Sequence, residues 1–301
     1  MKKLTHIMLT AILTTGSFHS TSSIVQPVSA SQGVANDYNA HIASQDISYV
    51  LKHHLMWVYP DGSFKPDEPI TQAQLVSSLV VVSGAKGQAS VPELPAKHWA
   101  KATYEKAKQA GFLFDVKIEP DKKLNREEAA RLTINAWEKH RRYRTQKNEG
   151  LSKSWSDVQF LVATGIMKPK AGAFPNGVST SKFDSLAQIT RAEVASMIRL
   201  LHTDLVEMQE GEKIAQEVHK NLTVENGKVV GRIPKNRFNW RVSVGFYFKD
   251  GRYENYFAGQ YFAVPIASIK LMNVSVLNSQ STILADYDYK ELPSLTRTKD
   301  M

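Results

Sequence analysis

The sequence predicts an α+β protein, with a helical N-terminal part followed by a small β-rich C-terminal domain. Apolar residues recur at helical spacing from about residue 41 to 205, whereas from about residue 221 they alternate as they do in strands. The composition, 42% hydrophobic and 22% charged, is that of a globular chain. These observations exclude wholesale disorder and a protein with many membrane spans.

The first thirty residues have the features of a secretory signal peptide. Lys2 and Lys3 precede a short apolar run over residues 7–13, and Val28-Ser29-Ala30 supplies a cleavage signal with the cut after Ala30. A polar leader over residues 31–42 follows. No later apolar run is long enough to span a bilayer. We therefore expect a secreted protein with no integral membrane segment after cleavage.

Charge and residue usage narrow the class of partner. The 38 basic and 29 acidic residues give a net charge of +9, which favours an anionic partner, and export argues against nucleic acid. The absence of cysteine excludes disulfide scaffolds and thiol nucleophiles. The nine histidines lack metal-ligand spacing, and the chain has neither a nucleophile elbow nor a phosphate loop. We expect no metal, no cofactor and no enzymatic activity.

Three helix starts share one signature. Each has an apolar residue, then Thr or Asn, then Gln or Glu three residues later, which is the pattern of a capping box. The three segments are Ile70 to Gln74, Leu124 to Glu128 and Ile189 to Glu193. They predict three repeats over about 43–84, 92–140 and 154–205, each built as helix, glycine stop, loop and capped helix.

At four places the repeats resemble S-layer homology (SLH) domains, which occur as three tandem copies on exported bacterial proteins. The segments that carry the resemblance are Trp155-Ser156-Asp157-Val158, His98-Trp99-Ala100, Asp61-Gly62-Ser63-Phe64-Lys65-Pro66 and Ile189-Thr190-Arg191-Ala192-Glu193. The resemblance covers about residues 43–203 and implies a pseudo-threefold helical bundle. It also implies grooves between repeats that bind secondary cell-wall polysaccharide, often pyruvylated, or a peptidoglycan-associated polymer. The protein would then sit non-covalently at the bacterial cell wall and surface.

Departures from the motif predict a degenerate triplet with only one or two competent grooves. Gln72 stands where the motif has Arg, and the second repeat has Asn125 for Thr and Glu127 for Ala.

The candidate polysaccharide-binding residues centre on two arginines. Arg126 and Arg191 occupy the first helical position, where we expect free amides and the positive end of the helix dipole to favour a carboxylate or phosphate. The alternative is that each pairs with a local glutamate, such as Glu128 or Glu193. An exposed tryptophan would offer a flat apolar surface for a sugar ring, and the resemblance implies further motif residues. The remaining candidates are Trp99, Trp155, Asp157, Asp61 and Gly62. The basic run over residues 139–153 is either an auxiliary contact or a solvated charge run.

The C-terminal region, residues 206–301, should hold a connecting helix and the β-rich domain. A helix from Arg191 to about Lys220, with a bend or break at Gly211, would join the two parts. Strands are expected over 241–248, 253–262, 269–277 and 282–289. About half of the aromatic residues there should be core, and the rest could form a binding face. Two other functions stay open: a wall-associated enzyme with a catalytic C-terminal domain, and an assembly module whose repeats no longer bind polymer.

Overall fold

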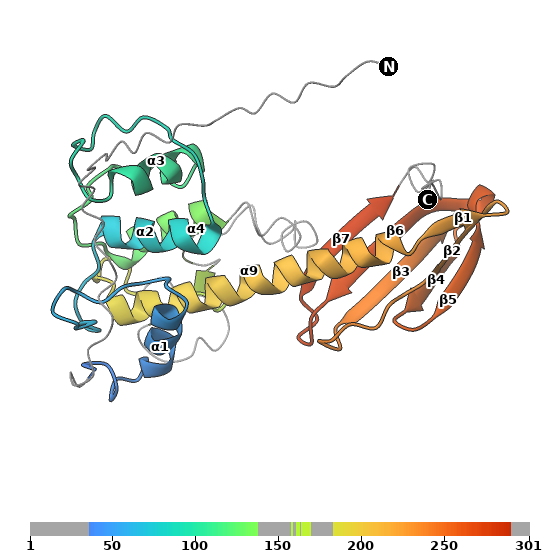
Figure 1. Cartoon of the computed structure of the whole chain (residues 1–301), viewed down its shortest axis with the longest axis horizontal. Coiled ribbons are helices and arrows are strands. Elements are labelled where there is room, and N and C mark those ends of the chain that lie inside the picture. Colours follow the sequence, from blue (N-terminus) through green and yellow to red (C-terminus); the bar gives the residue numbers. More distant parts are fainter. Residues whose placement is uncertain (1–35, 138–157, 159–160, 163, 170–182, 290–301) are drawn as a thin grey trace, which may run out of the picture. The chain divides into compact units, whose positions relative to one another are not determined.

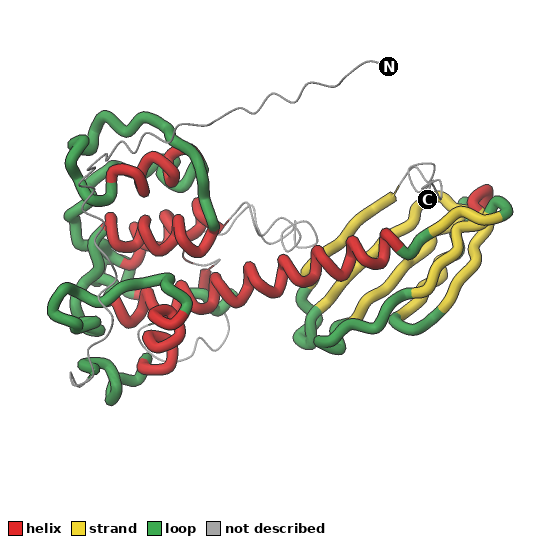
Figure 2. The backbone as a smooth tube through the Cα atoms, in the orientation of Figure 1, coloured by secondary structure: helices red, strands yellow, loops and turns green. Residues whose placement is uncertain are grey.

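The computed structural model describes residues 36–137, 158, 161–162, 164–169 and 183–289, and it combines helices with antiparallel sheets, as the α+β prediction requires (Figures 1 and 2). The predicted signal peptide and the basic run over 139–153 lie outside the described residues. The described part of the expected leader, residues 36–42, is folded: Tyr38 is buried, and Asp37 accepts hydrogen bonds from the amides of Phe64 (2.9 Å) and Lys65 (2.7 Å). The first repeat therefore begins before residue 43.

The helices of the N-terminal part surround one apolar core. Their bounds are α1 (Ser44–Lys52), α2 (Gln72–Ser83), α3 (Lys101–Gln109), α4 (Arg126–Trp137) and α9 (Arg191–Lys220). The core runs from Tyr38 to Leu201 and includes Val158 and Leu161 of the third predicted repeat. Segments distant in sequence are thus held together by shared burial.

All three predicted capping boxes are formed. The side chains of Thr71, Asn125 and Thr190 accept from the backbone amides of Gln74, Glu128 and Glu193, at 3.3, 2.8 and 3.2 Å. In return, the side chains of Gln74, Glu128 and Glu193 accept from the backbone amides of these capping residues. These reciprocal contacts fix where α2, α4 and α9 begin.

A closed ring of three backbone hydrogen bonds joins these helix starts. Leu124 N donates to Ile70 O at 3.0 Å, Ile189 N to Leu124 O at 3.1 Å, and Ile70 N to Ile189 O at 3.1 Å. The three side chains are buried. Each residue precedes a capping residue and both gives and receives one bond, so the three helix starts occupy equivalent positions.

The C-terminal part contains two antiparallel sheets. One has the order β1 (Thr223–Glu225), β2 (Lys228–Arg232), β5 (Tyr261–Pro265), and the other has the order β4 (Tyr253–Phe257), β3 (Arg241–Phe248), β6 (Ile269–Leu277), β7 (Ile283–Tyr289). Their buried residues share one core with the C-terminal half of α9. The same helix therefore contributes to both cores (Figure 1).

Two details differ from the expectations. The run over 253–262 is two strands in different sheets, because Gly259 adopts φ +88° and Gln260 N bonds back to Phe257 O. The helix α9 is continuous through Gly211, so the expectation of a break there is wrong. Gly211 instead permits close approach to the sheet, since a Cβ there would lie 2.5 Å from the Cβ of Leu284.

Candidate functional site

The first side chain of each capped helix is buried and holds a loop that belongs to another predicted repeat. Arg191, the first residue of α9, is 3% exposed. Its Nε donates to Phe64 O at 2.7 Å and its Nη2 to Trp57 O at 2.6 Å. The guanidinium lies 4.7 Å from the Tyr59 ring centroid and 4.6 Å from that of Phe64. Arg191 thereby fixes the loop over residues 57–66.

Arg126, in the second predicted repeat, makes the equivalent contacts with a loop of the third. Its Nε donates to Phe183 O at 2.9 Å, its Nη2 bonds Lys168 O, and its guanidinium lies 4.4 Å from the Phe183 ring centroid. Its Nη1 also pairs with Glu193 of α9. An arginine–glutamate pair thus forms at Arg126, but it joins two repeats and is not the local pair of the expected alternative.

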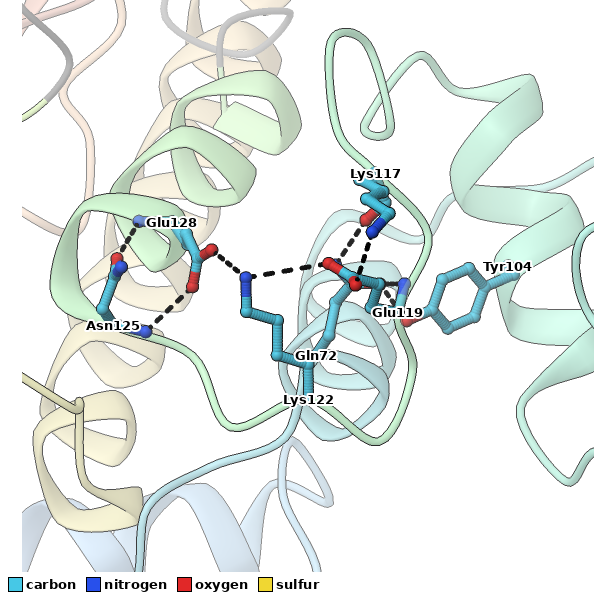
Figure 3. A network of polar contacts seen from close by, with 7 residues as sticks. All are labelled: Gln72, Tyr104, Lys117, Glu119, Lys122, Asn125 and Glu128. Atoms are coloured by element: carbon cyan, nitrogen blue, oxygen red, sulfur yellow. Dashed lines mark hydrogen bonds and ion pairs between the residues drawn. The ribbon is translucent and has the colours of Figure 1, made fainter.

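Gln72 completes the set at the start of α2 (Figure 3). Its Nε2 donates to Lys117 O at 2.8 Å, and its Oε1 accepts from the Tyr104 hydroxyl at 2.8 Å and from Glu119 N at 2.9 Å. Arg126 and Arg191 each bind a loop that contains a phenylalanine. The loop that Gln72 binds, from Lys117 to Leu124, is shorter and has none. An amide that both donates and accepts therefore suits this position, which explains the departure from the motif.

The helix amides at these sites are not free, which corrects one premise of the sequence analysis. The amides of the first two residues of each helix donate to loop carbonyls of another repeat: those of Gln72 and Ala73 to Lys122 and Pro120, those of Arg126 and Glu127 to Ala187 and Ser185, and those of Arg191 and Ala192 to Glu68 and Pro66. The third amide belongs to the capping box. A ligand anion consequently finds no open helix N-terminus at any of the three positions.

Burial lowers the pKa of both guanidinium groups, and the nearby Glu193 opposes this shift at Arg126, as Tyr59 and Glu68 do at Arg191. Arginine starts from so high a pKa that both groups remain charged. Their role in this structure is to position loops.

The loop over residues 57–66, held by Arg191, presents an aromatic and charged surface. Trp57 is 44% exposed, and Lys65 Nζ lies 4.3 Å from the Tyr59 ring centroid. Two predicted site residues are here. Gly62 makes the turn with φ +83°, and Asp61 accepts from the amide and hydroxyl of Ser63, which lowers the pKa of Asp61. Arg191 therefore holds the loop that carries Asp61 and Gly62.

A cavity of about 320 Å³ lies beside Gln72, at the loop that Gln72 holds. Its lysines pair with its own carboxylates: Lys122 with Glu128 (2.5 Å) and Glu119 (3.7 Å), and Lys117 with Glu119 (2.8 Å) (Figure 3). The hydrogen bond from Lys117 is the main cause of the lowered pKa of Glu119. Arg131 pairs with Asp115 in the same way. An anionic ligand would have to displace a carboxylate here.

The predicted platform residue Trp99 is 64% exposed and stacks on His98 at 5.8 Å. His98 Nδ1 accepts from Ala100 N, and its Nε2 lies 3.9 Å from Asp121. The other two motif residues, Trp155 and Asp157, lie outside the described residues.

Sequence reasoning missed the first repeat's counterpart of His98. His41 Nδ1 accepts from Ala43 N at 3.0 Å, and its Nε2 lies 3.3 Å from Asp67. Both repeats have a histidine two residues before an alanine, and a Pro-Asp pair follows later in the chain. His41 is followed by Pro66-Asp67, and His98 by Pro120-Asp121. The exposed Ile42 then occupies the place that Trp99 has in the second repeat.

The comparison with known families bears on this first segment. The family model of the S-layer homology domain matches residues 36–76, which include α1, the loop that Arg191 holds and the start of α2. The chain carries an S-layer homology domain. Such a domain indicates anchoring to wall polymers at the bacterial cell surface. The match covers one SLH repeat, so the two further repeats remain a prediction.

No curated protein matches the chain. Within the described ranges, no helix is both long and apolar enough to cross a membrane. Over those same residues, no group of three His, Asp or Glu side chains could hold a metal ion.

Proposed function

We propose that the protein attaches non-covalently to an anionic, pyruvylated or otherwise acidic secondary cell-wall polysaccharide through three SLH-like repeats arranged with pseudo-threefold symmetry. Two observations support three repeats in addition to the family match. The ring of hydrogen bonds through Ile70, Leu124 and Ile189 treats the three helix starts alike. The buried side chains of Gln72, Arg126 and Arg191 each reach into a loop of another repeat.

The observation that carries the proposal is the shape of the loop over residues 57–66. It lies inside the family match, and Arg191 locks its backbone at two carbonyls. The exposed indole of Trp57 offers a flat apolar surface for a sugar ring. Lys65, whose Nζ lies 3.6 Å from Asp61 Oδ2 in an exposed ion pair, offers an ammonium group for an acidic substituent. In this proposal Trp57 and Lys65 contact the polymer, while Arg191 is a positioning residue.

The three positions are unequal in this proposal. The loop beside Gln72 lacks the arginine, and the lysines of its cavity are neutralised by Glu119 and Glu128. The loop held by Arg191 keeps an arginine and an exposed tryptophan. We therefore place the main polymer site at residues 57–66 and expect the Gln72 position to contribute little. The protein would act by binding at the wall, not by catalysis.

Co-sedimentation of the full chain with purified wall, before and after the secondary polymer is stripped, tests the proposal. Trp57→Ala should weaken binding at least about tenfold, as expected for an aromatic anchor. The matched control is Phe114→Ala, because Phe114 is an exposed aromatic residue that lies outside the proposed site, just before the loop from Lys117 to Leu124. Unchanged binding by Trp57→Ala, or an equal loss with Phe114→Ala, would contradict the assigned site.

Arg191 needs a control for folding because it is buried. Arg191→Lys keeps the charge but loses the two-carbonyl grip, so it should lower binding by loosening the loop. If Arg191→Lys and Arg191→Ala both remain folded by circular dichroism and bind like wild type, the positioning role is wrong. Retention that survives stripping of the polymer would contradict the polymer itself as ligand.

A further inference from the structure

Among the described residues, other elements cover one side of the four-stranded sheet and leave the opposite side open. The helix α9 packs against β6 and β7, the Tyr287 hydroxyl bonds Glu212, and Gly211 lies against Leu284. Side chains alternate along a strand, so the opposite side is set by the register. We call that side the open face; it carries Arg241, Ser243, Gly245, Tyr247, Tyr253, Asn255, Phe257, Leu271, Asn273, Ser275, Leu277, Asp286 and Asp288.

Aromatic rings lie on one part of the open face. The Tyr247 and Tyr253 ring centroids are 4.6 Å apart, and Tyr247, Tyr253 and Phe257 are all exposed. The Tyr253 ring crosses Gly245, where a Cβ would lie 2.6 Å from the tyrosine oxygen. Gly245 thus lets the ring lie close to the neighbouring strand. Burial and the adjacent Tyr247 raise the pKa of Tyr253, so its hydroxyl remains a donor at neutral pH.

Fixed polar groups lie beside the rings. Asn273 Nδ2 donates to Asp288 at 2.7 Å and to Asp286 at 3.0 Å, and Ser275 Oγ donates to Asn273 Oδ1 at 2.6 Å. Asn255, between Tyr253 and Phe257 on β4, has a buried Oδ1 with no hydrogen-bond partner among the described residues. The amide and carboxylate groups of Asn273, Asp286 and Asp288 thus provide hydrogen-bonding partners for hydroxyl groups beside the rings.

The charged side chains of the open face indicate which kind of ligand it can bind. Arg241, at the end of β3 away from Tyr247, is the basic residue among these positions, and Asp286 and Asp288 are acidic. The two carboxylates outnumber this cation and disfavour an anionic polymer, whereas hydroxyl groups can bond to amides and carboxylates, and the C–H face of a sugar can pack on tyrosine. We propose that the open face binds an uncharged glycan chain, as a site separate from the anionic-polymer site of the helical part.

Titration of the full-length protein with chitohexaose, an uncharged N-acetylated hexasaccharide, tests this inference by calorimetry. The Tyr253→Ala variant should bind at least about tenfold more weakly, since Tyr253 supplies the ring above Gly245. Gly245→Ala, which keeps the tyrosine but displaces its ring, should also weaken binding. The matched control is Tyr261→Ala, because Tyr261 is an exposed tyrosine on the other sheet and its loss should change nothing.

The two sites can be tested separately. Trp57→Ala should lose the secondary polymer and still bind chitohexaose, while Tyr253→Ala should do the reverse. No binding of chitohexaose by wild type, or equal losses in Tyr253→Ala and Tyr261→Ala, would overturn the inference. Analytical ultracentrifugation adds one further outcome: a dimer that Tyr253→Ala disrupts would assign the open face to a second copy of the chain and overturn the glycan proposal.

Discussion

The Tyr104 hydroxyl donates a 2.8 Å hydrogen bond to Gln72 Oε1, and both side chains are buried. The bond joins α3 to the first residue of α2 and satisfies a hydroxyl whose pKa burial raises. A polar side chain that is both buried and fully engaged leaves unpaired groups when it is removed.

Gln72→Ala should therefore destabilise the protein, even though it should have little effect on polymer binding. The change leaves the buried Tyr104 hydroxyl without its partner, which costs about 1–3 kcal/mol, and also removes the part-buried bonds to Glu119 N and Lys117 O. Urea unfolding measures the loss. A double-mutant cycle with Tyr104→Phe isolates the shared bond, and purely additive effects would contradict it.

Gln72→Arg, which restores the family motif, should also be destabilising. An arginine cannot accept from Tyr104 or from Glu119 N, and the loop it would face has no phenylalanine at the place where Phe64 and Phe183 pack on the other two arginines. The unfolding midpoint in urea should fall below that of wild type. A midpoint equal to or above the wild-type value would show that the loop adapts.

Local signals could be predicted from the sequence, and pairings between distant segments could not. The capping boxes at Thr71, Asn125 and Thr190 depend on four consecutive residues, and all three formed as expected. The burial of Arg126 and Arg191 depends on loops from other repeats, which spacing along the chain does not reveal. An arginine at the first turn was therefore interpreted as an open anion site, although loop carbonyls occupy the neighbouring amides.

The β domain shows the same division. Alternation placed Val242, Val244, Phe246 and Phe248 on one buried side of β3. It did not separate β4 from β5, because the turn at Gly259 interrupts a run that is aromatic on both sides of it. Helix propensity predicts an interruption of the helix at Gly211. The structure shows instead that a glycine is needed there because Leu284 of β7 lies so close to the helix.

Gly211→Ala should destabilise the protein despite the better helix propensity of alanine. The added Cβ would lie 2.5 Å from the Leu284 Cβ, so α9 or β7 must shift; crowding of this kind costs about 1–3 kcal/mol, against a propensity gain of about 1 kcal/mol. Gln209→Ala, at an exposed position of the same helix, is the control and should be close to neutral. A stabilised Gly211→Ala variant would show that α9 does not press on the sheet there.

Folding stability should fall on acidification through His202. The ring Nδ1 of His202 lies 2.8 Å from the Tyr49 hydroxyl, and burial, with a smaller effect of His53, lowers the pKa of His202. Below the usual histidine pKa of about 6.5 the unfolded chain gains a proton that the folded chain accepts only at lower pH. This contribution is complete above that pH and is lost as the pH falls through the folded-state pKa.

Urea unfolding between pH 8 and pH 5 measures this effect. His202→Gln should give a shallower dependence of the unfolding free energy on pH than wild type. The exposed His54 provides the control, because His54→Asn should leave the slope unchanged. Identical slopes in wild type and His202→Gln would remove His202 as the cause.

The C-terminal domain should be dispensable for retention by the secondary polymer. The helix α9 contributes to both cores, so the residue at which the chain is truncated matters. Trp137 Nε1 donates to Asp204 at 2.9 Å, the first core ends at Leu201, and the second begins at Ile214. A chain that ends at Gln209 keeps the first of these contacts and cuts between the two cores. It should sediment with intact wall as the full chain does and, lacking the open face, should fail to bind chitohexaose. A truncated chain that is folded by circular dichroism but released from intact wall would instead place the anchor in the β domain.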